Sequence, residues 1–526
     1  MMTDTGTRDG TGAKGPAAGT EREAAADTAV RPVHPFDRRA LLVAGLVLAV
    51  LLALSSRYGF HRDELYFLDS ARHLQASYVD QPVLAPLLAR LSLTLFGASV
   101  VGLRLWAALA TAVTVLVGAL TAREFGGERR AQLLAAVATA TMPVLLSSGH
   151  IANSTSYTLL AWSATALVVV RIGRTGDTRW WLLAGALAGI GAEFNHLVGI
   201  FALALLATAL ATPARALLAN RWFAGGVLLA VLLVLPDVWW QAHHDWATVE
   251  MTGALRSEHG GAGHVPAWVV GQFGMTCLAM VPLWLAGLRL LWRAGVPLWR
   301  CLALSYGLLF VVFAVTAGEQ TYYLAGLYVC LLGAGAVALD GWLRERRQRW
   351  RSFVGATAVT AAASALTVLP VLPASAGAWT YGMNAASGET TGWPEMVRTV
   401  SGVWHGLPAD ERAHAVVYTM DYSEAGAVDT LGGSEGLPHA VSAHNTMWWW
   451  GPGDPAARTV VVVAPNPAYA PHYASTLRKR FAHVRLAATL RNPDGIPTIE
   501  DGGHVWVCTG PRHAWGATWQ RLRHYE

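Results

Sequence analysis

The sequence has few charged residues: Asp, Glu, Lys and Arg together make up 14% of its 526 residues. Soluble domains carry about 25% charged residues, so this composition indicates a protein that lies in a membrane. Cysteine is also scarce, and the absence of any C-x-x-C spacing gives no indication of a zinc or redox motif. The net charge of +5 is small and is spread between apolar segments, so it does not indicate a nucleic-acid partner.

Apolar residues are correspondingly abundant, at 53%, and the 23 tryptophans are typical of membrane interfaces. Residues 1–36 are rich in Gly, Ala and Thr, have no signal-peptide layout, and are predicted to be a disordered cytoplasmic tail. Residues 37–373 then hold apolar segments long enough to span a bilayer. We predict about eleven spanning helices, at 40–56, 100–122, 131–147, 155–171, 180–194, 197–211, 222–240, 266–288, 299–317, 322–340 and 352–373.

The basic residues alternate from one loop to the next, which predicts the orientation. One set of loops is rich in arginine, from Arg38 and Arg39 through to the cluster at 344–351. The short loops of the other set, at 148–154, 195–197 and 318–321, contain no Lys or Arg. The positive-inside rule therefore places the N-terminus in the cytoplasm. With an odd number of spans, the C-terminus lies on the outer side of the membrane. The chain is therefore predicted to be a multi-pass protein of the plasma membrane.

Three longer segments face outward in this prediction: a polar loop at 57–99, a loop at 241–265 and the tail at 374–526. The tail has three strand-like runs, at 415–418, 459–464 and 504–508, separated by helical or Pro/Gly-rich stretches. We therefore predict a mainly α membrane protein with a C-terminal extracytoplasmic α/β domain.

Acidic residues at the start of the first outer loop are the strongest candidates for chemistry. Asp63 and Glu64 are adjacent just after a span, and Asp80 follows where Pro82 turns the chain back toward the membrane. Carboxylates beside a bilayer are costly and tend to be functional. They could act as a general base or hold a divalent metal ion, whereas the alternative is a solvated interfacial loop.

Other polar residues are predicted to face the same side. Arg62, Arg104 and Arg256 could bind a lipid phosphate, although an arginine such as Arg104 could also simply snorkel to the interface. His196 and Glu319 lie in or beside apolar segments and could face the cavity of Asp63. The run His243-His244-Asp245 suggests a metal, but adjacent histidines seldom share one comfortably, so metal binding stays open.

Several of these stretches together resemble one enzyme family. Residues 60–97, Arg104, the run TYYLAGLY at 321–328 and the run from 423 to 445 are similar to family-39-like glycosyltransferases of the C-type fold. That group includes bacterial relatives of dolichyl-phosphate-mannose–protein mannosyltransferases and of the lipid A aminoarabinose transferase. The resemblance extends over nearly all of the chain after residue 40.

The resemblance implies transfer of a sugar from a polyprenyl-phosphate donor at the outer face, with inversion. It implies that Asp63 is the base, with Glu64 beside it, and that Asp80-Gln81-Pro82 is the second motif. Some relatives have a lysine where this chain has Gln81, and this difference shifts the expected phosphate contact to the three arginines. Tyr322 and Tyr323 belong to the matching hairpin. The acceptor could be a protein, a cell-envelope glycan or a lipid.

Two other functions compete with the glycosyltransferase. A secondary transporter would place its ionisable residues near mid-membrane, whereas these acids lie in the outer leaflet and loops. A non-catalytic receptor with an outer domain would leave Asp63, Glu64 and Asp80 without a task.

Overall fold

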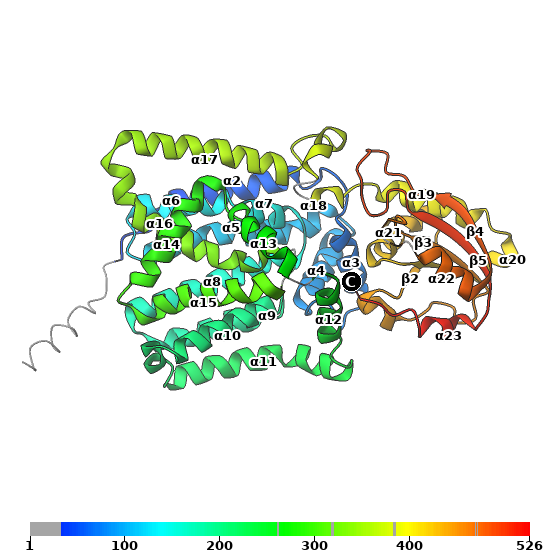
Figure 1. Ribbon diagram of the computed structural model, residues 1–526, viewed down its shortest axis with the longest axis horizontal. Helices are drawn as coiled ribbons and strands as arrows, with labels where there is room; N and C mark the ends of the chain where they lie inside the picture. Colours follow the sequence, from blue (N-terminus) through cyan, green and yellow to red (C-terminus); the bar gives the residue numbers. More distant parts are fainter. Residues whose placement is uncertain are drawn as a thin grey trace, which may run out of the picture.

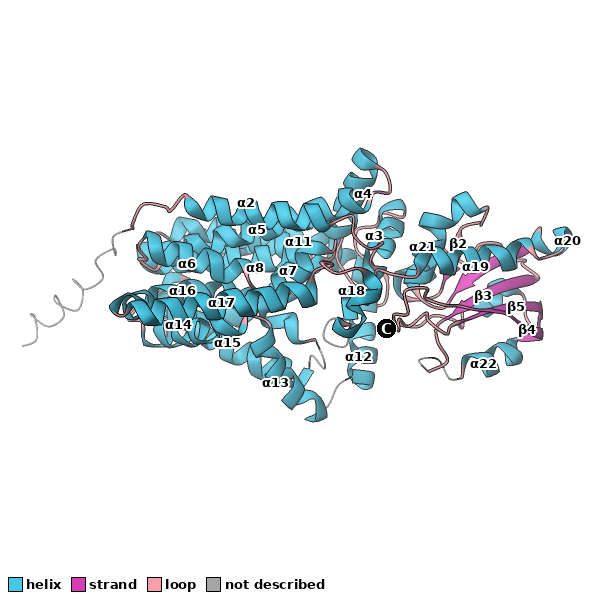
Figure 2. Ribbon diagram, turned by 90° about the horizontal axis from the view of Figure 1, so that it is seen from above, coloured by secondary structure: helices cyan, strands magenta, loops and turns pink. Residues whose placement is uncertain are grey.

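The computed structural model describes residues 33–525 apart from 260–261, 317–319, 382–384, 469 and 471. A bundle of helices occupies one end of the long axis and a mixed sheet with its helices occupies the other (Figure 1). Between them lie helices that belong to neither, among them α3 (Arg62–Arg72), α4 (Leu84–Phe96), α12 (Ala247–His259) and the short α18 (Ala385–Gly388) (Figure 2).

Each of the eleven predicted segments coincides with a helix or a bent pair of helices. The bundle helices are α2 (Arg39–Leu54), α5 (Val100–Glu124), α6 (Arg129–Ala140), α7 (Pro143–His150), α8 (Ser154–Thr175), α9 (Trp181–Ala192), α10 (Leu197–Leu210), α11 (Arg221–His243), α13 (Val265–Gly274), α14 (Val281–Arg293), α15 (Pro297–Thr316), α16 (Ala325–Glu345) and α17 (Arg347–Val368). By length and composition five helices among the described residues can cross a membrane, or up to seven if the pairs bent by 58° and 89° each count once. The count of eleven spans therefore stays a prediction.

The outward faces of the bundle are apolar. In α11 only 11% of the most apolar window is buried, and Leu228, Val231 and Leu232 are each more than half exposed. Such a surface would be unfavourable in water but suits lipid, so the chain is a multi-pass membrane protein. Inside, α14 and α16 pack backbone to backbone, because a Cβ on Gly287 or Gly335 would meet the other helix's carbonyl groups.

The arginine-rich loops meet at one end of the bundle. Arg174 donates to Glu124 across 2.7 Å, and Arg344 donates to Glu128 across 3.1 Å. Arg130 lies over the Trp350 ring at 4.1 Å, so tryptophans cover several of these cations. The loops that the charge pattern assigned to one side therefore contact one another.

The C-terminal part is a five-stranded sheet in the order β2-β1-β3-β5-β4. Its strands are β1 (Ala415–Thr419), β2 (Ala440–Ser442), β3 (Thr459–Ala464), β4 (Phe481–Thr489) and β5 (His504–Pro511). The β1 pairings with β2 and β3 are parallel, and β5 pairs antiparallel with β3 and β4. The flanking helices are α19 (Trp393–His405), α20 (Ala409–Arg412), α21 (Tyr422–Leu431), α22 (Tyr473–Arg480) and α23 (Trp515–Trp519). The sequence predicted β1, β3 and β5 but neither β2 nor β4.

The predicted outer loops are partly helical. Helices α3 and α4 lie within 57–99, and α12 lies within 241–265. The segment between α3 and α4 contains a tight turn, in which the Tyr78 N–H donates to the Gln81 carbonyl across 3.0 Å. The Val79 N–H donates to Thr446 Oγ1 across 2.8 Å, so this turn is bonded to the C-terminal part of the chain.

Candidate active site at the junction of bundle and sheet

The N-terminus of α3 presents the first acidic motif. His61 caps the helix by accepting from the Asp63 N–H across 3.2 Å, and Glu64 returns to accept from the His61 N–H across 2.8 Å. This reciprocal pair is a capping box with histidine as its first member. Successive helical residues point about 100° apart, so Asp63 and Glu64 face different surroundings.

Glu64 faces inward and is fully buried. Its Oε1 and Oε2 accept from Arg104 Nε and Nη2 across 2.8 and 2.9 Å, and Oε1 also accepts from the Ala152 N–H. Arg104, 1% exposed, further donates to the Ser55 and Gly59 carbonyls. A bidentate buried pair of this kind is fully satisfied. The structure therefore places Glu64 and Arg104 as a clamp that holds α3 on the bundle, outside the cavity described next.

Asp63 lines a cavity of about 1390 Å³ at the junction. Its side chain is 35% exposed. Oδ1 accepts from the Tyr422 hydroxyl across 3.2 Å, and among the described residues Oδ2 has only the longer 3.7 Å contact with His61 Nδ1. The same cavity is lined by apolar residues of the bundle, among them Val144, Ile200 and Val238. The cavity is thus lined by both polar and apolar side chains.

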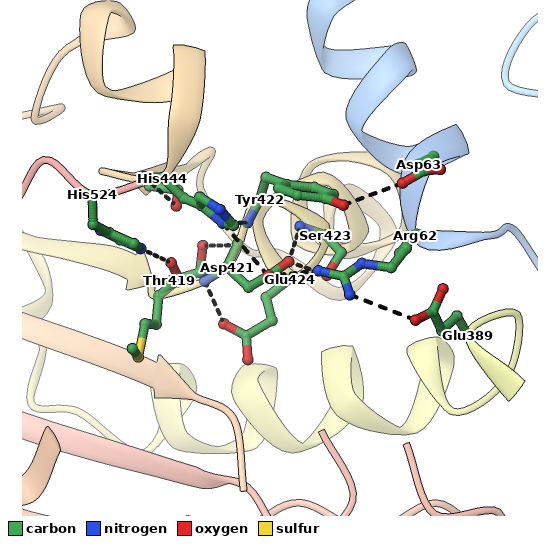
Figure 3. A network of polar contacts seen from close by, with 12 residues as sticks. Arg62, Asp63, Glu389, Thr419, Asp421, Tyr422, Ser423, Glu424, His444 and His524 are labelled. Carbon is green, nitrogen blue, oxygen red and sulfur yellow. Dashed lines mark hydrogen bonds and ion pairs between the residues drawn. The ribbon is translucent and has the colours of Figure 1, made fainter. Parts of the chain in front are cut away.

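Arg62 links the cavity to two carboxylates from far along the chain (Figure 3). Its Nη2 donates to Asp421 Oδ2 across 2.8 Å, and Nη1 lies 3.6 Å from Glu389 Oε1. Burial raises the pKa of Asp421, but the Arg62 charge and the His444 contact outweigh this effect and hold that pKa far below its usual range. Burial likewise opposes ionisation of Glu389, but the His61 hydrogen bond and Arg62 lower its pKa to about 2. Arg62 is therefore already neutralised.

Asp80 lines the same cavity behind Asp63. The Tyr66 hydroxyl donates to Asp80 Oδ1 across 2.7 Å. Burial raises the pKa of Asp80 to about 6, with the Asp63 charge adding to the effect and the Tyr66 hydrogen bond opposing it. This carboxyl can therefore gain or lose a proton close to neutral pH.

Four other predicted residues, Gln81, His196, Tyr322 and Tyr323, also line the cavity. Gln81 is 4% exposed, and its Nε2 has no hydrogen-bond partner among the described residues. His196 Nε2 lies 3.0 Å from Asp237 Oδ2. The rings of Tyr322 and Tyr323 meet edge to face at 5.1 Å. Gln81 thus offers an uncommitted donor to a ligand.

Two predicted residues cannot be placed in this way. Glu319 and the Arg256 side chain lie outside the described residues. Within the described part of the chain, no three His, Cys, Asp or Glu side chains are grouped so as to hold a metal ion. The His244 ring stacks on Trp240, and the His243 ring lies tilted against Trp239.

The sequence prediction missed the residues that the C-terminal part contributes. These are Glu389, Asp421, Tyr422 and His444. One local signal was present, because Asp421 and Glu424 have the three-residue spacing of a capping box before the apolar start of a helix. That signal predicts a helix start. It does not show that Tyr422, at this helix start, contacts Asp63, which lies 359 positions earlier in the sequence.

Part of the chain matches a known family. Residues 80–240 match the family described as dolichyl-phosphate-mannose-protein mannosyltransferase. The match begins at Asp80 and covers less than a third of the chain. No curated protein matches the sequence.

Solved structures match over far more of the chain. The structure of ArnT from Cupriavidus metallidurans bound to undecaprenyl phosphate has a TM-score of 0.59 at 15% identity, with 89% of this chain and 97% of that chain covered. The mycobacterial arabinofuranosyltransferase AftD has a TM-score of 0.52 at 16% identity, with 92% of this chain but 41% of that chain covered. The oligosaccharyltransferase of Archaeoglobus fulgidus gives 0.50 at 12% identity, with 83% and 69% covered. None of the three is a transporter.

Proposed function

Because the chain has the fold of the C-type membrane glycosyltransferases, we propose that it transfers a sugar from a polyprenyl-phosphate donor to an acceptor at the outer face. The observation that carries the proposal is the cavity, which joins an apolar wall of bundle helices to the half-satisfied carboxylate of Asp63. A donor with an isoprenoid chain and a polar sugar needs both surfaces. The bound undecaprenyl phosphate of ArnT supports this donor class.

The proposed reaction is an inverting displacement with Asp63 as base. An acceptor hydroxyl gives its proton to Asp63 Oδ2 while its oxygen bonds to the anomeric carbon of the sugar. The bond from that carbon to the phosphate oxygen breaks, and polyprenyl phosphate leaves with the electron pair. One base then suffices, because the leaving group is already a stabilised anion.

The donor phosphate needs contacts that are not yet committed. The charge of Arg62 is paired with Asp421 and Glu389, and Arg104 is enclosed with Glu64. Arg62 Nε has no partner among the described residues and remains a possible donor. Gln81 Nε2 is unpartnered and buried at the cavity wall. We therefore assign Gln81 to the phosphate, with the Tyr322 hydroxyl and Arg256 as further candidates. Glu64 and Arg104 position α3 in this proposal rather than contact the substrate.

The proposal is tested by a transfer assay in nanodiscs with a panel of radiolabelled polyprenyl-phosphate sugars and cell-envelope extract as acceptor. We expect the wild type to transfer label from at least one donor. Asp63→Asn keeps the shape of the side chain but removes the base, so its rate should fall by at least about 100-fold.

Asp410→Asn is the matched control, because Asp410 is exposed on α20 and does not line the cavity; it should transfer at the wild-type rate. A wild type that is folded yet releases sugar from no donor contradicts the proposal. Normal turnover by Asp63→Asn contradicts the assignment of the base alone.

A further inference from the structure

The part of the cavity around Asp63 is built from two parts of the chain that are 359 residues apart. Arg62 and Asp63 open α3 beside the membrane bundle, and Asp421 and Tyr422 lie at the start of α21 in the sheet-containing part. Figure 3 shows both helix starts close together, with the Tyr422 hydroxyl directed at Asp63 and the Arg62 side chain passing beside the Tyr422 ring.

The start of α21 is held as firmly as that of α3. Asp421 caps the helix by accepting from the Ser423 N–H across 2.7 Å, and Glu424 accepts from the Asp421 N–H across 3.2 Å. The other oxygen of Asp421 accepts from Arg62. Two reciprocal caps therefore meet through one ion pair.

The helices themselves touch at a glycine. A Cβ added to Gly426 would lie 2.7 Å from the carbonyl carbon of Leu65, which leaves no room for a side chain between α21 and α3. This close approach sets the distance between the two helix starts. It also brings the Tyr422 ring to 4.9 Å from the Tyr66 ring.

Tyr422 is the residue through which this docking reaches the cavity. Its hydroxyl donates to Asp63 Oδ1, its ring lies 4.9 Å from the guanidinium carbon of Arg62, and it lines the cavity. The hydrogen bond fixes one oxygen of the carboxylate and leaves Oδ2 for the acceptor hydroxyl. A carboxylate without this contact could rotate away from the attack geometry.

We propose that Tyr422 is a positioning residue for Asp63, so that the active site is complete only when the C-terminal α/β domain is seated on α3. This inference rests on the proposed function and deepens it. It gives the outer domain a part in the transfer step itself, in addition to any part in acceptor binding.

Tyr422→Phe tests the proposal, because it keeps the ring against Tyr66 and Arg62 and removes only the hydroxyl. Losing one hydrogen bond to a charged group should lower kcat about 10-fold. The Kd of the donor, measured by binding of the labelled polyprenyl-phosphate sugar, should stay within about 2-fold, since the hydroxyl contacts the base and not the lipid. The midpoint of thermal unfolding is measured on the same samples.

Tyr473→Phe is the matched control, since it makes the same change in the same domain, outside the residues that line the cavity; its kcat should equal that of the wild type. An unchanged kcat in Tyr422→Phe overturns the inference while the proposed function stands. A fall in kcat that is matched by a lower unfolding midpoint and a weaker donor Kd also overturns it, because that pattern indicates packing alone. A wild type without transfer activity is the separate failure of the proposed function.

Discussion

Two neighbouring acids in this chain have opposite surroundings. Asp63 borders the cavity with one oxygen free of short contacts, whereas Glu64 is buried against Arg104. Spacing alone identified both as candidates, and only the family resemblance singled out Asp63 as the base, because the arginine that pairs with Glu64 is 40 positions away. Which of two adjacent carboxylates turns inward is decided by tertiary packing. Local spacing alone does not contain that information.

The pH dependence of the reaction should report Asp80. Burial raises the pKa of Asp80 to about 6, and the hydrogen bond from Tyr66 opposes that rise. If the ionised form is the active one, kcat/KM should fall as the pH drops through about 6. Tyr66→Phe removes a donor that favours the charged form, so this acid limb should move to higher pH.

The measurement is the pH profile of kcat/KM for the wild type and Tyr66→Phe between pH 4.5 and 8. A limb that stays in place in the variant would show that another group titrates. A limb that moves to lower pH would contradict the sign of the Tyr66 interaction.

At the scale of elements, the sequence was most informative about long apolar segments. All eleven predicted spans coincide with a helix or a bent pair of helices, because an apolar backbone segment satisfies its own hydrogen bonds best as a helix. Several of these helices are shorter than a bilayer's thickness, so the pattern predicted where helices form but not how many of them span. The strands β1, β3 and β5 are buried apolar runs and were predicted. Strand β2 has three residues, and the edge strand β4 is largely exposed and carries Arg485, so neither has a clear apolar pattern.

The contact between α3 and α21 gives a prediction for Gly426→Ala. The added methyl group would meet the Leu65 backbone at 2.7 Å, so the two helices must separate by several tenths of an ångström. We expect kcat to fall several-fold, although alanine stabilises a helix interior by about 1 kcal/mol relative to glycine. The assay is the same sugar transfer in nanodiscs.

Gly402→Ala is the control for this change. Gly402 lies in α19 of the same part of the chain, and a Cβ there meets nothing within 4 Å. The variant should retain wild-type kcat and unfold at a slightly higher temperature. Equal activity in both variants would show that the spacing of α3 and α21 does not matter to the reaction.

At the scale of the whole molecule, the arginine-rich loops contact one another at the end of the bundle remote from the sheet (Figure 1). Loop charges could be read from the sequence, because orientation in a membrane depends on them directly. The position of the outer domain on α3 could not be predicted from the sequence. It depends on residues such as Asp421, whose local pattern indicates only a helix cap.

Cysteine labelling tests the predicted orientation. Asp410→Cys lies on the exposed α20 and Arg347→Cys lies at the start of α17 among the basic loops. A membrane-impermeant maleimide should label position 410 on intact cells and position 347 only after permeabilisation. The four native cysteines are buried, so their background should be low. Labelling of position 347 on intact cells would contradict the orientation.

The distance in sequence between Asp63 and Tyr422 also has a consequence for biosynthesis. The ribosome completes the bundle helices and the proposed base before it reaches the residues that cap α21 and complete the cavity. During that interval the nascent protein can already meet lipid in the bilayer. If Tyr422 is required, such an intermediate binds the donor without transferring its sugar. A product truncated after α17 is then inactive. Late synthesis of α21 would thus determine when the enzyme first becomes active.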